Sequence, residues 1–112
     1  MTRKIVCFLT IGTIAILCVG CGKREPPKTT SQLIQTVCIE ACQQARAAGQ
    51  DLSQGPCLLD PVSQNPNWVC DIAHSPRQPI DNLPQNQCQT FRQGKAHHFI
   101  ELTPDCQLLT VH

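Results

Sequence analysis

The chain has 112 residues, nine of them cysteine, and a formal net charge of +1 at pH 7. A chain of this length forms one domain at most. Seven basic and eight acidic residues follow Cys21, so the net charge of that part is −1 (7 − 8). Because these residues form no basic stripe, the sequence predicts that the protein does not bind nucleic acid.

Residues 1–20 have the composition of an export signal. Arg3 and Lys4 form a short basic start, an apolar run begins at Ile5, and small residues lie near its end. A basic region, an apolar region and small residues in this order are typical of a signal peptide. Residues 1–20 are therefore predicted to be one.

The end of this segment, Leu17-Cys18-Val19-Gly20-Cys21, resembles the bacterial lipobox. In that motif a small residue, here Gly20, precedes a cysteine that becomes the mature N-terminus and carries diacylglycerol through a thioether. The match departs from the motif at Cys18, where the lipobox usually has leucine. The resemblance implies a bacterial lipoprotein that is anchored to membrane lipid through Cys21.

Two other interpretations of residues 1–21 remain open, an uncleaved membrane helix and plain secretion. The apolar stretch from Ile5 to Gly22 is about 18 residues long, at the lower limit for a membrane span. All three interpretations place residues 22–112 outside the cytoplasm. Lipoproteins kept in the inner membrane often carry Asp after the lipidated cysteine. Gly22 takes that place here, so an outer-membrane or cell-surface location is expected.

Six cysteines remain after Cys7, Cys18 and Cys21 are assigned to the signal and the anchor. An even number in a small exported domain is typical of a disulfide framework, which a core this small needs for stability. Six cysteines allow 15 pairings. The six are Cys38, Cys42, Cys57, Cys70, Cys88 and Cys106.

Residues 21–30 are predicted to be the lipidated N-terminus and a tether, since they are charged and carry Pro26 and Pro27. Thr30 or Ser31 is expected to cap a helix that runs to about residue 48, with Gly49 as its stop. Its apolar residues recur at three- and four-residue spacing. Two cysteines lie on that face, four residues apart, and are therefore expected to bond to different partners. These are Cys38 and Cys42.

Residues 31–112 are predicted to form one α+β domain, in which the N-terminal helix packs on a short antiparallel sheet. Turn-forming residues predict a loop over 51–67, a strand over 68–73 and a second loop over 75–83. A short helix is expected from Pro84 to Gly94, and a hairpin over 96–102 and 106–111. We favour a Cys88–Cys106 bond, with the helix cysteines bonded to Cys57 and Cys70.

No catalytic or metal-binding motif is present. His97 and His98 point to opposite faces of a strand, and neither HExxH nor paired CxxC spacing occurs. A redox site would need CxxC at a helix start, whereas three residues separate the two helix cysteines. Ser75 beside His74 is not a hydrolase motif. The sequence predicts no enzyme activity, no cofactor and no metal.

The loop that contains Arg77 is the most distinctive predicted surface. Pro76 and Pro79 hold its backbone extended, as in a rigid recognition loop or a protease-inhibitor loop, although prolines also serve as plain connectors. The candidate binding residues are His74, Arg77 and His97. The leading hypothesis is a non-enzymatic lipoprotein that binds or braces a protein partner at the cell envelope. The alternatives are a protease inhibitor that uses Arg77, and a metal or redox protein.

Several segments of the exported part also resemble small exported proteins with no assigned activity. This resemblance implies no catalytic residues. The segments are 51–53, 55–58, 68–71, 74–77 and 96–99.

Overall fold

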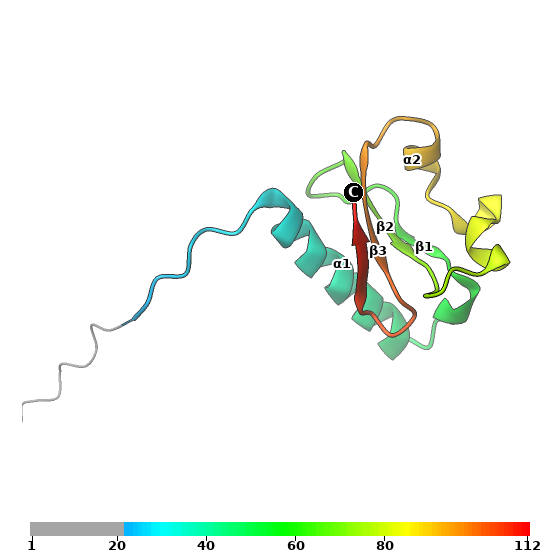
Figure 1. Cartoon of the computed structure of the whole chain (residues 1–112), viewed down its shortest axis with the longest axis horizontal. Coiled ribbons are helices and arrows are strands. Elements are labelled where there is room, and N and C mark those ends of the chain that lie inside the picture. The colour runs from blue at the N-terminus through cyan, green and yellow to red at the C-terminus, as the bar shows by residue number, and fades with distance from the viewer. Residues whose placement is uncertain (1–21) are drawn as a thin grey trace, which may run out of the picture.

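The computed structural model describes residues 22–112 (Figure 1). The predicted signal peptide and the predicted lipidation site, Cys21, lie outside the described residues. Residues 22–29 form an exposed segment without regular structure that leads into the first helix. Within residues 22–112, no helix is both long and apolar enough to cross a membrane.

Helix α1, Thr30–Ala47, begins one or two residues earlier than the sequence indicates. Thr29 is its N-cap. The Thr29 side chain accepts a hydrogen bond from the Gln32 backbone N–H, and the Gln32 side chain accepts one from the Thr29 backbone N–H. This reciprocal pair satisfies two donors that a helix start otherwise leaves unpaired. The helix stops before Gly49, whose φ of 83° favours glycine, as predicted.

The sheet has four strands in the order β1-β2-β3-β4: β1 Cys57–Leu59, β2 Trp68–Ile72, β3 His98–Leu102 and β4 Leu108–Val111. The predicted strand and hairpin are present as β2 and as β3–β4. Strands β2 and β3 run parallel, so the sheet is mixed rather than wholly antiparallel. The reason is the long connection over residues 73–97, which is long enough to cross over and return to the starting end. Strand β1 lies in the segment that was expected to be a loop.

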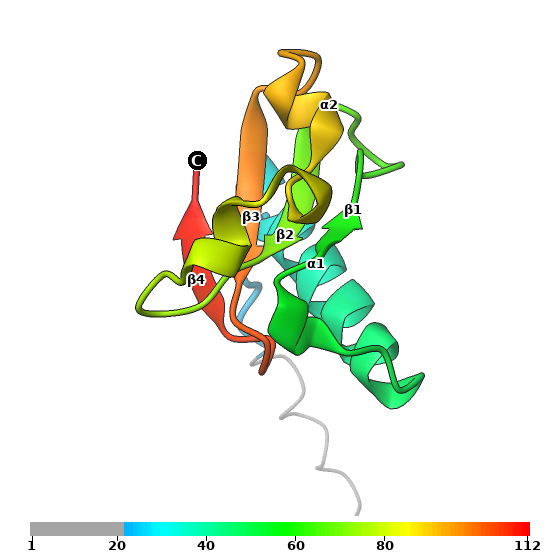
Figure 2. The same cartoon turned by 90° about the vertical axis from the view of Figure 1, so that its right-hand side faces the viewer.

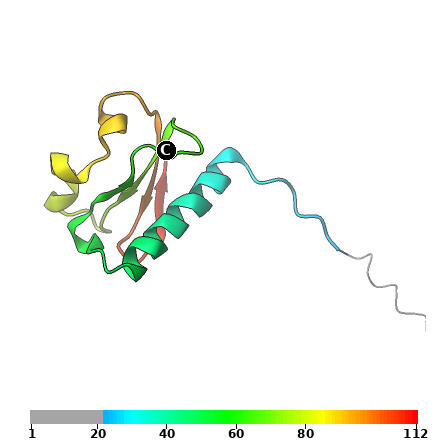
Figure 3. The same ribbon diagram turned by 180° about the vertical axis from the view of Figure 1, so that it is seen from behind.

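The crossover connection covers the face of the sheet opposite α1, and we call this face the second face (Figure 2). The connection contains two 3-10 helices, η3 Pro79–Asn82 and η4 Pro84–Asn86, and one turn of helix, α2 Gln89–Arg92. A third 3-10 helix, η2 Leu52–Gln54, precedes β1. The helix expected from Pro84 is therefore broken. Figure 3 shows the sheet from behind, with α1 on one side of it and the crossover connection on the other.

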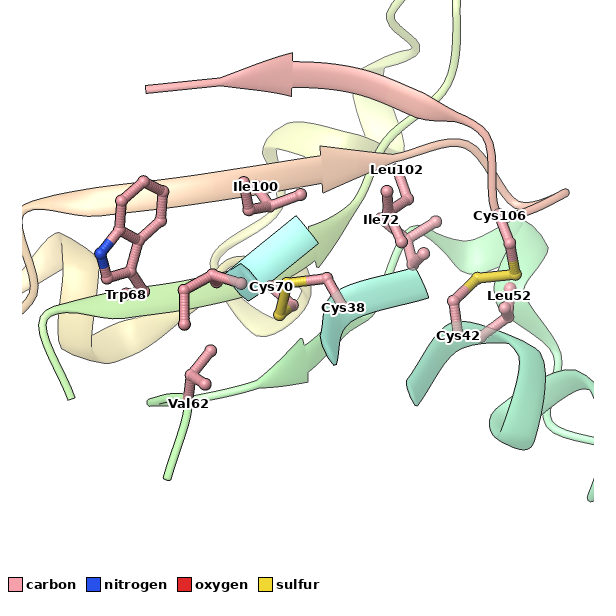
Figure 4. Packing of buried hydrophobic residues seen from close by; sticks show 11 residues of the cluster. Cys38, Cys42, Leu52, Val62, Trp68, Cys70, Ile72, Ile100, Leu102 and Cys106 are labelled. Atoms are coloured by element: carbon pink, nitrogen blue, oxygen red, sulfur yellow. A yellow bond between two sulfur atoms is a disulfide. The ribbon is translucent and has the colours of Figure 1, made fainter. Parts of the chain in front are cut away.

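Three disulfides use all six cysteines of the domain: Cys38–Cys70, Cys42–Cys106 and Cys57–Cys88. The first two join α1 to the sheet and to the turn before β4 inside the main core (Figure 4). The third joins β1 to the residue before α2. Disulfides of this kind form in an oxidising, extracellular type of environment.

The two helix cysteines have different partners, as predicted, and Cys38 bonds to Cys70. The favoured Cys88–Cys106 bond is wrong, and Cys57 does not bond to the helix. The physical reason is the position of the crossover. It places Cys88 on the second face, whereas Cys106 belongs to the core between the sheet and α1.

Candidate binding site

A cavity of about 350 Å³ lies on the second face, between the sheet and the crossover connection. Its floor consists of Val69 and Asp71 from β2 and of Phe99 and Glu101 from β3. Alternate residues of a strand point to the same face, and the parallel register sets Val69 beside Phe99 and Asp71 beside Glu101. The floor therefore has an apolar pair followed by an acidic pair.

The wall opposite the sheet comes from the end of the crossover and includes Phe91 and Arg92. Helix α2 is held at its start by Asp60, whose carboxylate accepts hydrogen bonds from the first two backbone N–H groups of the helix, at 2.7 and 3.0 Å. Phe91 makes an edge-to-face contact with Phe99, with ring centroids 5.0 Å apart. His112 stacks on Phe99 at 4.9 Å. The rings of Phe91 and Phe99 make the apolar end of the cavity.

Asp71 is a carboxyl inside the sheet with only 9% of its surface exposed. One of its oxygens, Oδ1, accepts a hydrogen bond from the Ile72 backbone N–H at 3.0 Å. Within residues 22–112, no side chain donates a hydrogen bond to it. The pKa of Asp71 is raised to about 8, mainly by burial. The hydrogen bond from Ile72 lowers this pKa, and the negative charge of Glu101 raises it further. With this pKa, most of the Asp71 carboxyl is protonated at pH 7.

Arg77 lines the acidic end of the cavity and pairs with Glu101, with Nη1 and Oε1 2.9 Å apart. Its Nε donates a second hydrogen bond to Asn82 at 2.8 Å. The hydrogen bond to Glu101 raises the pKa of Arg77 further above its ordinary value. The loop predicted around Arg77 exists, and these two contacts hold the Arg77 guanidinium at the edge of the cavity, with 43% of the side chain exposed.

His74 anchors the same loop through Asp81, which is 1% exposed. The His74 ring Nδ1 lies 2.8 Å from Asp81 Oδ1, while Oδ2 accepts the backbone N–H groups of His74 and Gln78 at 3.0 and 2.8 Å. Burial raises the pKa of Asp81, but these hydrogen bonds outweigh it and the net pKa is lowered. His74 thus positions the loop, and nothing in the sequence pattern singles out its partner.

His97 lies at the other end of the parallel strands from His74. Its Nδ1 is 2.7 Å from Asn67 Oδ1. The neighbouring His98 stacks on Trp68, with ring centroids 4.6 Å apart. The structure therefore brings His74 and Arg77 together in one loop but does not bring His97 to them.

Within residues 22–112, one group of potential metal ligands converges: Cys57, Asp71 and Cys88, whose ligand atoms lie within 4.8 Å of one another. The two sulfur atoms are bonded to each other in a disulfide, so neither is a free thiolate. These residues do not form a metal site while the disulfide is intact.

Sequence reasoning missed the residues that give this cavity its character. The visible signal for Asp71 is an acid within the otherwise apolar strand Trp68–Ile72. The remaining residues have no such signal, because only the crossover brings them together. They are Phe91, Arg92, Phe99 and Glu101.

No protein-family model matches this chain, and comparisons with curated proteins and with solved structures find no similar protein. The functional assignment therefore depends on the chemistry of the cavity.

Proposed function

We propose that this protein is a membrane-anchored lipoprotein, lipidated at Cys21, whose disulfide-stabilised domain binds a small ligand in the second-face cavity without converting it. The site of action is the cell envelope, at the outer membrane or the cell surface. The lipobox-like segment before Cys21 and the exposed, proline-containing tether support the anchor. The three disulfides support an exported location.

The observation that carries the binding function is the buried carboxyl of Asp71 in an open cavity. A buried carboxyl that accepts only one hydrogen bond, here from the Ile72 N–H, costs folding free energy, so its presence in a central strand needs a reason other than stability. Strongly shifted carboxyls in concave sites are typical of functional sites. The volume of about 350 Å³ falls at the lower end of the range for small-molecule pockets.

The lining favours binding over catalysis. Among the described residues that line the cavity, the one sulfur, that of Cys88, is bonded to Cys57. None of these lining residues is a serine, threonine or lysine that could act as a nucleophile. The second carboxyl, Glu101, is engaged by Arg77. The lining thus has groups that orient a ligand and lacks a group that attacks one.

The protease-inhibitor hypothesis requires a side chain at position 77 that reaches into a protease. The ion pair of Arg77 with Glu101 and its hydrogen bond to Asn82 oppose that conformation. The cavity therefore supports the ligand-binding proposal better. Assays of a trypsin-like protease with the unmodified protein and with Arg77→Ala separate the two proposals, because only an inhibitor loop loses inhibition in the variant.

The binding proposal is tested by an NMR screen of the oxidised protein with small acids, amines and alcohols. We expect shifts at Asp71 and Phe99 that disappear in Gln87→Trp, a variant that fills the cavity from its wall. The recovered ligand should be chemically unchanged. A screen in which no compound shifts these residues, or in which a compound is converted, contradicts the proposal.

The anchor is tested independently through Cys21→Ser in the full chain. We expect the unmodified protein in the membrane fraction, with a diacylglycerol mass on the N-terminal peptide, and the variant without that mass. An unmodified Cys21 thiol in the membrane-bound protein contradicts the lipid anchor.

A further inference from the structure

We propose that the ligand of the second-face cavity is a small amphipathic organic anion. Its head group, a carboxylate or a similar oxyanion, lies between Asp71 and Arg92. Its apolar body covers the ring pair Phe91–Phe99. This inference rests on the proposed function and names the chemical class of the ligand.

The first argument is the charge of the lining. Four ionisable side chains line the cavity, and two of them, Arg77 and Glu101, neutralise each other at 2.9 Å. Arg92 makes no ion pair within the described part of the chain. With Asp71 protonated, the lining carries one net positive charge, which attracts an anion and repels a cation.

The second argument is the direction of hydrogen bonding. The groups that act on Asp71 are Glu101 on β3, Arg77 in the loop, Asp81 in η3 and the Ile72 backbone N–H. That N–H occupies Oδ1 and leaves Oδ2 to carry the proton. A protonated carboxyl donates, and a guanidinium only donates. Two donors that face the same cavity are satisfied together by an oxyanion, through charge-assisted hydrogen bonds.

The third argument is the spacing of the floor. The apolar pair Val69–Phe99 and the acidic pair Asp71–Glu101 are two residues apart along parallel strands, about 6.6 Å. A ligand that contacts both pairs carries its head group a few carbon atoms from its ring or chain. The molecule 3-phenylpropionate meets this requirement and serves as the probe.

The experiment compares three probes of one skeleton, 3-phenylpropionate, 3-phenylpropylamine and 3-phenylpropanol. Each is titrated by calorimetry and NMR at pH 6.5 into the oxidised protein, purified from cells that express the full chain. We expect the acid to bind at least tenfold more tightly than the amine, with the alcohol between them. Arg92→Gln should lower the affinity for 3-phenylpropionate at least tenfold. Lys95→Gln, which removes an exposed charge outside the lining, should change this affinity less than twofold.

The pH dependence separates a donor role of Asp71 from a merely structural one. Affinity for 3-phenylpropionate should be constant between pH 6 and 7 and should fall about tenfold per pH unit above the pKa of Asp71, near 8. Asp71→Asn retains an N–H donor and should show no such fall. If the affinity of the unmodified protein for 3-phenylpropionate does not change with pH, the donor role of Asp71 is overturned.

The outcomes distinguish this inference from the proposed function. If the amine binds as tightly as the acid or more tightly, and shifts the cavity residues, the anion inference is overturned while ligand binding stands. If none of the three probes shifts the cavity residues, the anion inference is overturned for ligands of this size. If the wider screen also gives no shift there, the binding function itself fails.

Discussion

The buried Asp71 carboxyl makes a quantitative prediction about stability. Its pKa is about 8 in the folded protein and 3.8 as the ordinary value. Between these values the folded state holds more protons than the unfolded chain, so the free energy of unfolding falls as the pH rises, by about 1.4 kcal/mol per pH unit. Asp71→Asn removes this titration while its amide oxygen still accepts the Ile72 N–H.

The expected advantage of Asp71→Asn over the unmodified protein therefore grows with pH. It should be below about 1 kcal/mol at pH 4, about 4 kcal/mol at pH 7, and constant at about 6 kcal/mol above pH 8 to 9. Urea denaturation at a series of pH values, with the disulfides intact, measures this difference. Asp105→Asn, at a side chain that is 81% exposed, is the control and should give no difference that grows over this range.

A difference between Asp71→Asn and the unmodified protein that is flat with pH would refute the reasoning. It would mean that the carboxyl is ionised and solvated in the folded state. An advantage that shrinks with rising pH would have the same consequence, because it requires a folded pKa below 3.8. Either result would also remove the protonated donor on which anion binding depends.

Three further predictions concern the support of the cavity. Asp81→Asn should lower stability by about 2 to 4 kcal/mol at pH 7, since it weakens charge-assisted hydrogen bonds. The loss should begin to shrink as the pH falls below 3.8, the ordinary pKa, toward the lowered pKa of the folded state. A loss that is as large at pH 3 as at pH 7 contradicts this. Gly55→Ala and Gly49→Ala both put a side chain at positive φ, but only at Gly55 would the added Cβ meet another group, Asp81 Oδ1 at 2.6 Å. Thermal denaturation should therefore show that Gly55→Ala loses more stability than Gly49→Ala, by at least about 1 kcal/mol. Equal losses of stability would refute the contact. Replacing Cys57 and Cys88 by alanine should lower the free energy of unfolding by about 2 to 5 kcal/mol. Amide hydrogen exchange should increase in residues 73–97, while α1 stays protected. Unchanged exchange in residues 73–97 would show that the disulfide does not hold the crossover connection.

Local signals determined much of the fold. The spacing of Ile34, Cys38 and Cys42 predicts the helix and its buried face, because burial of an apolar stripe needs only local sequence. The turn at 103–105 between two apolar runs predicts the β3–β4 hairpin for the same reason. The even set of six cysteines predicts that the domain is held by disulfides. The helix and the hairpin depend on residues that are close in sequence, and the disulfide prediction depends only on the number of cysteines.

Non-local contacts decided the rest. Periodicity does not tell whether β2 and β3 run parallel, and the parallel register is what sets Asp71 beside Glu101. The crossover over residues 73–97 lies on the second face, which takes Cys88 away from Cys106 and brings it to Cys57.

The cavity follows from the same crossover. Arg92 and Phe91 are about 20 residues from Asp71 in sequence, and no local pattern joins them. The sequence by itself thus determined a stapled α+β domain and predicted its export. Only the tertiary structure decided that Asp71 and Arg92 line the same cavity, because this depends on the path of the chain between two strands.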